Sequence, residues 1–211
     1  MFGALRQLFI PKPPSEVEAT YIALLRAARN PFFFTALNVP DTIDGRFELI
    51  VLHLFLLQHR LTNEGGLAPY PRHEDGVTPA ASGSLALRID KTTGASETAF
   101  CQFLSEAFFN DMDTSLREMG VADTGVSKRI KKMGKAYHGR LQAYTAGLND
   151  ATALRAALAR NLYGTVEQGD VEALHRLASY VETMTAQLAT TNTALITSGG
   201  YAWPDSSTLG L

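Results

Sequence analysis

The chain has 211 residues, of which 45% are hydrophobic and 19% charged, and its formal net charge at pH 7 is −2. This is the composition of a globular protein and not of a disordered chain. The single cysteine, Cys101, excludes an intrachain disulfide and with it a secreted, cross-linked scaffold. The small net charge excludes a protein that binds nucleic acid through a generally basic surface, but it leaves room for a local basic site.

The charge is distributed very unevenly along the chain. Residues 41–127 carry 6 basic and 13 acidic side chains, for a net charge of −7, whereas residues 128–149 carry six basic side chains and no acid. The outer stretches 1–40 and 150–211 contribute +2 and −3. An acidic block therefore directly precedes a basic block. The two either neutralise each other in the folded protein or present separate charged faces to a partner.

The N-terminal segment 1–14 is amphipathic. Phe2, Leu5 and Phe9 fall at helical spacing with Arg6 among them, so this segment is expected to dock onto the domain or to lie weakly on a membrane surface. A charge inside the apolar part and the prolines that follow do not fit a signal peptide. We therefore expect a cytoplasmic protein, and peripheral contact with the cytoplasmic face of the inner membrane stays open.

Helical patterns follow one another from residue 15 onward. Capping residues and apolar spacing predict six helices, over about 15–29, 41–60, 96–119, 124–147, 150–162 and 170–188. The centre of the second is apolar on all sides, which predicts a buried central helix. The expected caps are Asp41, Thr42 or Asp44 for the second helix, Asp123 or Thr124 for the fourth and Asp150 for the fifth.

The segments between and after these helices have the composition of loops. Residues 62–84 hold four Gly and three Pro in 23 positions, which predicts a mobile loop, and a short extended piece is expected over 85–93. A flexible tail is expected over 198–211. The predicted fold class is therefore all-α: a single compact domain over 15–197 with six or seven helices and one long Gly/Pro-rich loop.

Asp111 and Asp113 are the first candidates for chemistry, because paired carboxylates can bind a divalent cation. Residues two apart do not share a helix face, and the sequence offers no third ligand. We therefore expect no metal site. Asp113 is instead predicted to pair with Arg117 four residues on, and Asp111 to be solvated or to pair across helices.

Two other reactive residue types have equally plain interpretations. A lone histidine in an apolar helix, His53, is typical of a core histidine satisfied by one backbone or side-chain hydrogen-bond partner. Cys101 lies between phenylalanines and is expected to be buried as a small apolar side chain. The sequence contains no nucleophile elbow, zinc-protease helix or phosphate-binding glycine loop. We expect no enzymatic activity and no cofactor.

The basic block is the strongest candidate for a binding site. Five cations lie within about two helical turns: Lys128, Arg129, Lys131, Lys132 and Lys135. The opposing stripe is apolar and consists of Val126, Ile130, Met133 and Tyr137. Such a helix suits a phosphate backbone, anionic lipid head groups or an acidic protein surface. The alternative is a solvated helix that pairs with the acidic block.

Several segments together resemble one protein family. They are DTIDGRFELIVLH at 41–53, FNDMDTSLREMGVAD at 109–123, VSKRIKKM at 126–133 and YHGRLQAY at 137–144. In this order they resemble the ubiquinol–cytochrome c chaperone family, the assembly factors for cytochrome b of respiratory complex III. The resemblance covers about residues 15–165.

The resemblance implies a non-enzymatic, all-α assembly factor that binds newly made cytochrome b. Mitochondrial members act with a small partner protein near the ribosomal exit tunnel. This chain lacks their presequence and membrane-proximal segment, so it is expected to be a bacterial relative, and its small partner and ribosome contact stay open. A ribosome- or nucleic-acid-binding adaptor that acts through residues 128–140 is the alternative function.

The resemblance also suggests roles for individual residues. The expected contacts with client or partner are Asp111, Asp113, Arg117, Arg140 and the five cations of 128–135. The expected structural motif residues are Asp44, Gly45, Arg46, His53, Tyr137 and Tyr144. Partly buried charges need partners, so Asp44, Arg46, Asp113 and Arg117 are equally interpreted as internal ion pairs. In that interpretation Arg46 and Arg140 bridge the acids of 111–123.

Overall fold

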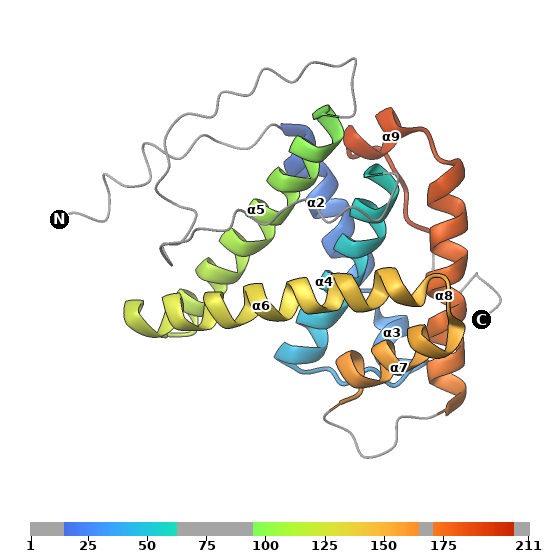
Figure 1. Ribbon diagram of the computed structural model, residues 1–211. Coiled ribbons are helices and arrows are strands. Elements are labelled where there is room, and N and C mark those ends of the chain that lie inside the picture. The colour runs from blue at the N-terminus through green and yellow to red at the C-terminus, as the bar shows by residue number, and fades with distance from the viewer. Residues whose placement is uncertain (1–14, 63–94, 165–170, 205–211) are drawn as a thin grey trace.

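The computed structural model describes residues 15–62, 95–164 and 171–204. All secondary structure in these ranges is helical (Figure 1), which confirms the predicted all-α fold class. The segment 1–14, the predicted loop and extended piece from 63 to 93, and residues 205–211 lie outside the described residues. The helices are α2 (Ser15–Ala28), α3 (Pro31–Thr35), α4 (Ile43–Leu61), α5 (Ala95–Glu118), α6 (Asp123–Gly147), α7 (Ala151–Leu162), α8 (Val171–Thr190) and α9 (Thr193–Thr197).

Six of these helices correspond to the six predicted ranges, and the five-residue α3 and α9 are additions. A helix of five residues shows no apolar period, so the sequence pattern does not indicate it. α3 instead begins with local signals. The Asn30 side chain accepts a hydrogen bond from the backbone N–H of Phe32, and Pro31 occupies the first turn.

Cap residues set the helix starts, and one prediction about them is wrong. Thr42 caps α4 by accepting a hydrogen bond from Gly45 N at 3.1 Å, and Asp150 caps α7, both as expected. α6, however, is preceded by Ala122, which makes no side-chain cap bond. Asp123 is already the first residue of the helix, and its carboxylate is engaged by Arg117.

α4 is the centre of the fold, as its all-round apolar sequence predicts. Every residue from Glu48 to Gln58 is buried. α4 packs against α2, α5, α6, α7 and α8, so all its sides are covered. The core around it draws on every described helix, for example through Val17, Phe33, Leu52, Leu104, Tyr137, Leu158, Val181 and Ile196. The described residues therefore form a single core.

The chain after α9 departs from the sequence-based expectation. A flexible tail is expected from residue 198, but Tyr201 and Trp203 pack partly buried against the core. The Trp203 ring lies 4.9 Å from the ring of His53. Gly199 turns the chain with φ +73°, and its Cα approaches α2 so closely that a Cβ would lie 2.5 Å from the Cβ of Ala19. Residues 198–204 are thus a packed part of the domain, because their two aromatic rings bury apolar surface.

His53 sits at the middle of this core with both ring nitrogens bonded. Nδ1 lies 2.7 Å from the carbonyl oxygen of Leu49, and Nε2 lies 2.8 Å from the hydroxyl of Tyr180. A carbonyl only accepts, so Nδ1 carries the proton and Nε2 accepts from Tyr180. Burial lowers the pKa of His53 to about 4. The sequence-based interpretation of His53 as a satisfied core histidine agrees with this geometry.

The neutral state of His53 predicts a loss of stability in mild acid. The unfolded chain binds a proton near pH 6.5, whereas the folded protein does so only near pH 4. Stability is therefore fully present above pH 6.5 and falls as the pH drops through this window, by about 2 kcal/mol between pH 7 and pH 5. Urea unfolding at pH 7 and at pH 5 measures this loss of stability. A His53→Gln variant should lack this component, and equal pH dependence in both proteins would contradict the prediction.

Gly45 predicts a second stability effect, because α4 begins in close contact with the chain before it. A Cβ on Gly45 would lie 2.0 Å from the carbonyl oxygen of Pro40. Gly45→Ala should therefore destabilise the protein by about 2 kcal/mol, which lowers the thermal midpoint by roughly 4–8 °C. Gly139→Ala is the matched control, since a Cβ there meets nothing within 4 Å. The control should be neutral or stabilising, and equal midpoints for the two variants would refute the steric explanation.

Candidate functional site: the basic face of α6

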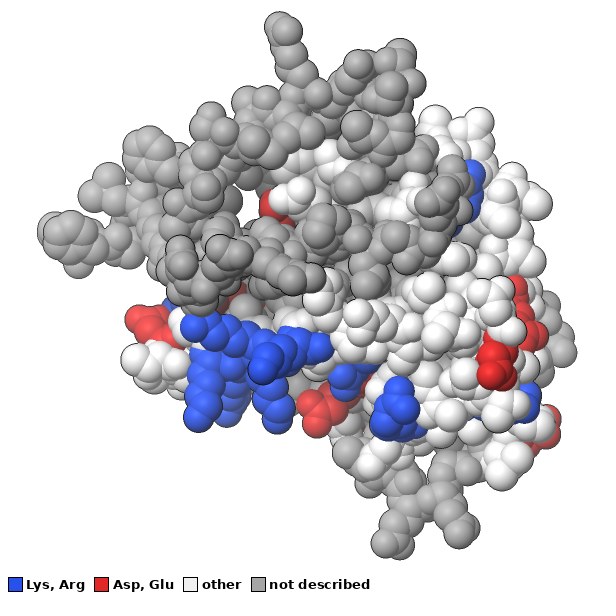
Figure 2. All heavy atoms as spheres, in the orientation of Figure 1, with Lys and Arg blue, Asp and Glu red and all other residues white. Residues whose placement is uncertain are grey.

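The basic block forms one continuous line on the outside of α6. Lys128, Lys131, Lys132 and Lys135 fall at positions i, i+3, i+4 and i+7, which brings them to the same side of a helix. We call these four residues the lysine stripe. All four are exposed, and so is Arg129 beside them. Figure 2 shows a dense group of Lys and Arg side chains at this end of α6. The expected cationic surface is thus present on the outside of the protein.

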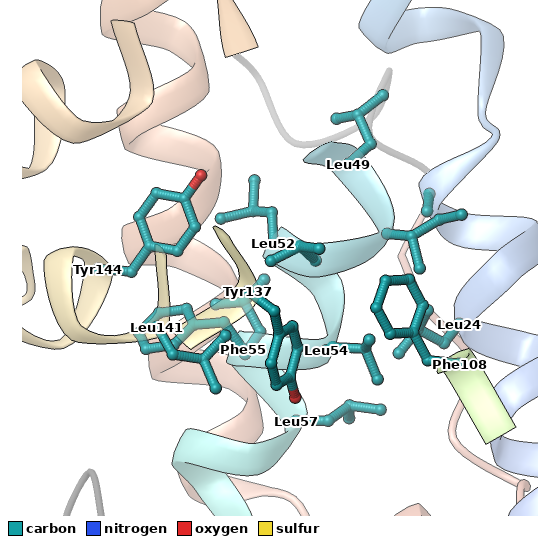
Figure 3. Packing of buried hydrophobic residues seen from close by; sticks show 14 of the residues in the cluster. Leu24, Leu49, Leu52, Leu54, Phe55, Leu57, Phe108, Tyr137, Leu141 and Tyr144 are labelled. Atoms are coloured by element: carbon teal, nitrogen blue, oxygen red, sulfur yellow. The ribbon is translucent and has the colours of Figure 1, made fainter. Parts of the chain in front are cut away.

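The opposite side of α6 is buried in the core. Val126, Ile130, Tyr137, Leu141 and Tyr144 lie on it. Figure 3 shows three of them, Tyr137, Leu141 and Tyr144, among side chains of α4. The amphipathic pattern expected from the sequence is confirmed. Because the apolar side is held by the core, the lysine stripe keeps a defined orientation on the surface.

Nothing in the described part of the chain neutralises the lysine stripe. The ion pairs among the described residues involve other cations, namely Arg46, Arg117 and Arg140. The lysines of the stripe lie three or four residues from one another along the helix. Each such pair of like charges destabilises the helix by a few tenths of a kcal/mol. The stripe also lies in the N-terminal half of α6, where the helix dipole is positive. Its charge is therefore unfavourable for the helix itself.

Arg117 pairs with two acids at the turn between α5 and α6. Its Nε lies 2.5 Å from Asp113 Oδ2, and its Nη1 bonds to Asp123 at the start of α6. The predicted pair of Asp113 with Arg117 is therefore present, and Asp123 joins it. Arg117 and Asp123 are exposed and Asp113 is partly exposed, so solvent screens these pairs and they add little to stability. They connect the end of one helix to the start of the next.

Asp111, two residues before Asp113, points to a different side of α5 and bonds to α2. The Tyr21 hydroxyl donates a hydrogen bond to its Oδ2 at 3.0 Å. Burial and the nearby Asp111 carboxylate raise the pKa of Tyr21. The structure thus agrees with the expected pairing of Asp111 across helices. Within the ranges that the structure describes, no three His, Cys, Asp or Glu side chains group as metal ligands would.

Arg140 ties α6 to the central helix. Its guanidinium donates two hydrogen bonds to the carboxylate of Glu48 and lies 5.8 Å from the centre of the Phe47 ring. Only 5% of the Glu48 side chain and 22% of the Arg140 side chain are exposed. Burial raises the pKa of Glu48, and the guanidinium opposes this shift. Removing one partner would leave a buried charge unpaired, which typically costs 3–5 kcal/mol.

The prediction that Arg46 and Arg140 bridge the acids of 111–123 is wrong. Arg46 pairs with Asp41 five residues earlier, where both side chains are more than half exposed. Arg140 pairs with Glu48, because the buried face of α6 points toward α4 and not toward the end of α5. Asp44 is exposed in the first turn of α4, where an acid interacts favourably with the helix dipole.

Tyr137 belongs to a buried polar network that the sequence analysis missed. Its hydroxyl donates to Gln58 Oε1 at 2.8 Å and lies 3.2 Å from Ser105 Oγ. Gln58 Nε2 donates in turn to Ser105 Oγ and to the backbone oxygen of Cys101. Burial raises the pKa of Tyr137 to about 12. The sequence feature that could have indicated this network is Gln58, a polar residue directly after the apolar run of the second predicted helix. Tyr144 is fully buried and packs against Phe55.

The lysine stripe should be dispensable for folding. Lys131→Gln/Lys132→Gln removes like-charge neighbours, so we expect its free energy of unfolding in urea to equal that of the unmodified protein or to exceed it by up to about 1 kcal/mol. Arg26→Gln/Arg160→Gln is the matched control, because it removes two exposed charges from the last turns of α2 and α7. Cations there favour the helix, so this control should lose a few tenths of a kcal/mol. A clear loss in the lysine variant would mean that the stripe is structural.

Comparisons with known proteins place the chain in a family. Residues 35–203 match the model of the family described as Ubiquinol-cytochrome C chaperone. The crystal structure of the Cbp3 homolog from Brucella abortus is similar, with a TM-score of 0.68 and 33% sequence identity over 92% of this chain and 91% of that chain. A comparison with curated proteins gave no match. No helix in the described ranges is both long and apolar enough to cross a membrane. The family match spans most of the sequence, and the chain therefore belongs to the ubiquinol–cytochrome c chaperone family.

Proposed function

We propose that this protein is an assembly chaperone that binds newly made cytochrome b of the cytochrome bc1 complex, respiratory complex III. The observation that carries the proposal is the family match over residues 35–203. The similarity to the Cbp3 homolog over nearly the whole length of both chains supports it. The proposed role is binding of a protein client at the cytoplasmic face of the inner membrane, without catalysis.

The geometry suggests how the expected site residues divide between two roles. Asp111, Asp113, Arg117 and Arg140 each have a partner inside the molecule. We assign them to the scaffold that holds α2, α4, α5 and α6 together. The lysine stripe and Arg129 have no such partner in the described ranges. They are therefore the proposed contact surface, whereas a small partner protein and a ribosome contact stay predictions.

Apolar side chains on the surface offer further contacts for a hydrophobic client. The large exposed ones among the described residues lie on separate segments and are Ile22, Ile43, Met119, Val171 and Leu195. Single exposed apolar residues are common on globular proteins. These five therefore add to the proposal only together with the family match.

Deletion of the gene in an organism that respires through complex III tests the proposed client. We expect loss of assembled complex III and of the haem b absorbance of its membranes, with the other respiratory complexes retained. A tagged copy of the protein should restore the complex and co-purify with cytochrome b that lacks the later subunits.

The glycine variants provide matched controls for this experiment. Gly139→Ala should restore complex III fully, and Gly45→Ala should restore it less well as the growth temperature rises, because its fold is less stable. Normal complex III in the deletion strain would overturn the proposed function. Co-purification with a different membrane protein would show that cytochrome b is not the client, while the protein would still be a chaperone.

A further inference from the structure

The outer face of α6 continues beyond the lysine stripe without any acid. Residues 124–149 contain no Asp or Glu. Gly139, Gln142 and Ala146 follow Lys135 along the same line of the helix and are exposed. A Cβ at Gly139 would meet nothing within 4 Å, so no other described part of the protein covers this point. The face is therefore cationic at one end and neutral, with mostly small side chains, along the rest.

The dimensions of this face suit an extended, flat surface. From Lys128 to Ala146 the helix rises by about 27 Å at 1.5 Å per residue. The side chains of the neutral half are short, so the helix can approach a partner along its whole length. The acids at its N-terminal end do not extend into the face, since Asp123 is paired with Arg117 and Glu118 belongs to the preceding helix.

We propose that the lysine stripe docks α6 lengthwise on the anionic head-group surface of a lipid bilayer. This inference rests on the proposed function in one respect, namely that the client is a membrane protein and has to be met at the bilayer. Lysine ammonium groups provide charge complementarity to acidic lipids. The docked orientation would turn the face opposite to α6 away from the membrane.

The structure favours a bilayer over nucleic acid as the occupant. The exposed face carries no aromatic side chain on which a base could stack. Four of its five cations are lysines, which act as point charges and lack the planar fork of arginine that reads guanine.

The strength of docking follows from the number of cations. Each lysine near an acidic membrane raises the partition coefficient about fivefold, and the attraction falls off within a Debye length of about 10 Å. Because the whole chain carries a net charge of −2, attraction depends on the orientation of this one face. Binding should therefore be reversible and sensitive to salt.

Vesicle co-sedimentation of the full-length chain tests the proposal. The vesicles are phosphatidylcholine with or without phosphatidylglycerol, at low and at high salt. We expect binding only with phosphatidylglycerol and weakening by high salt. Lys131→Gln/Lys132→Gln should reduce the partition coefficient about 30-fold, corresponding to about 1 kcal/mol per lysine. Arg26→Gln/Arg160→Gln, with the same change in net charge, should stay within about twofold of the unmodified protein.

A charge-preserving variant separates docking from folding. Lys131→Arg/Lys132→Arg should retain vesicle binding, and a urea unfolding curve checks each variant for a stable fold. Equal binding to pure phosphatidylcholine, or no effect of the lysine variant, would overturn the proposal. Sedimentation of the protein with ribosomal RNA but not with the vesicles, in a parallel experiment, would also overturn it. The vesicles contain no cytochrome b, so this result is independent of the deletion experiment, and either proposal can fail alone.

Discussion

The burial of α4 on all sides is the constraint on which the rest of the structure depends. A helix with no solvent-facing side must supply a hydrogen-bond partner for every polar side chain it carries, since an unpaired buried polar group costs several kcal/mol. α4 carries three such residues in its buried stretch: Glu48, His53 and Gln58. Their partners lie on α5, α6 and α8, three of the helices packed around α4. Glu48 bonds to Arg140 of α6, His53 to Tyr180 of α8, and Gln58 to Ser105 of α5 and Tyr137 of α6.

These three ties fix the helices around α4 in a way that apolar packing alone does not. Hydrophobic contacts are non-directional and tolerate sliding, whereas a bidentate ion pair or a side-chain hydrogen bond between two helices has a directional geometry. Glu48 and Gln58 lie ten residues apart along α4, and both bond to side chains of α6. Together they set the direction of α6 across the central helix, and with it the direction in which the outer face of α6 points.

The charged residues thereby divide into two groups with different physical roles. Arg140, Arg117 and Asp111 are engaged within the molecule and connect helices. The lysine stripe is left unneutralised among the described residues and is unfavourable for α6 by its own repulsion. One helix thus carries a scaffold residue on its inner side and a cationic surface on its outer side. The proposed docking on lipid and the proposed chaperone role both depend on this division.

The sequence by itself determined the fold class, the central position of α4, the amphipathic character of α6 and the family. These follow from apolar periodicity, cap residues and a set of motif segments, all of which are local along the chain. It also indicated the Asp113–Arg117 pair, because the two residues are one helical turn apart.

Only the tertiary structure decided which distant residues meet. Arg140 lies 92 positions from Glu48 and Tyr180 lies 127 positions from His53, and no spacing rule connects residues so far apart. Tyr201 and Trp203 look like tail residues until the helices assemble the core against which both pack, with Trp203 beside His53 of α4. Helix formation depends on neighbours in the chain, whereas the pairing of buried charges and the orientation of a surface depend on how the helices pack. The sequence therefore predicted a basic amphipathic helix, and the packing around α4 made its lysines an exposed, oriented face.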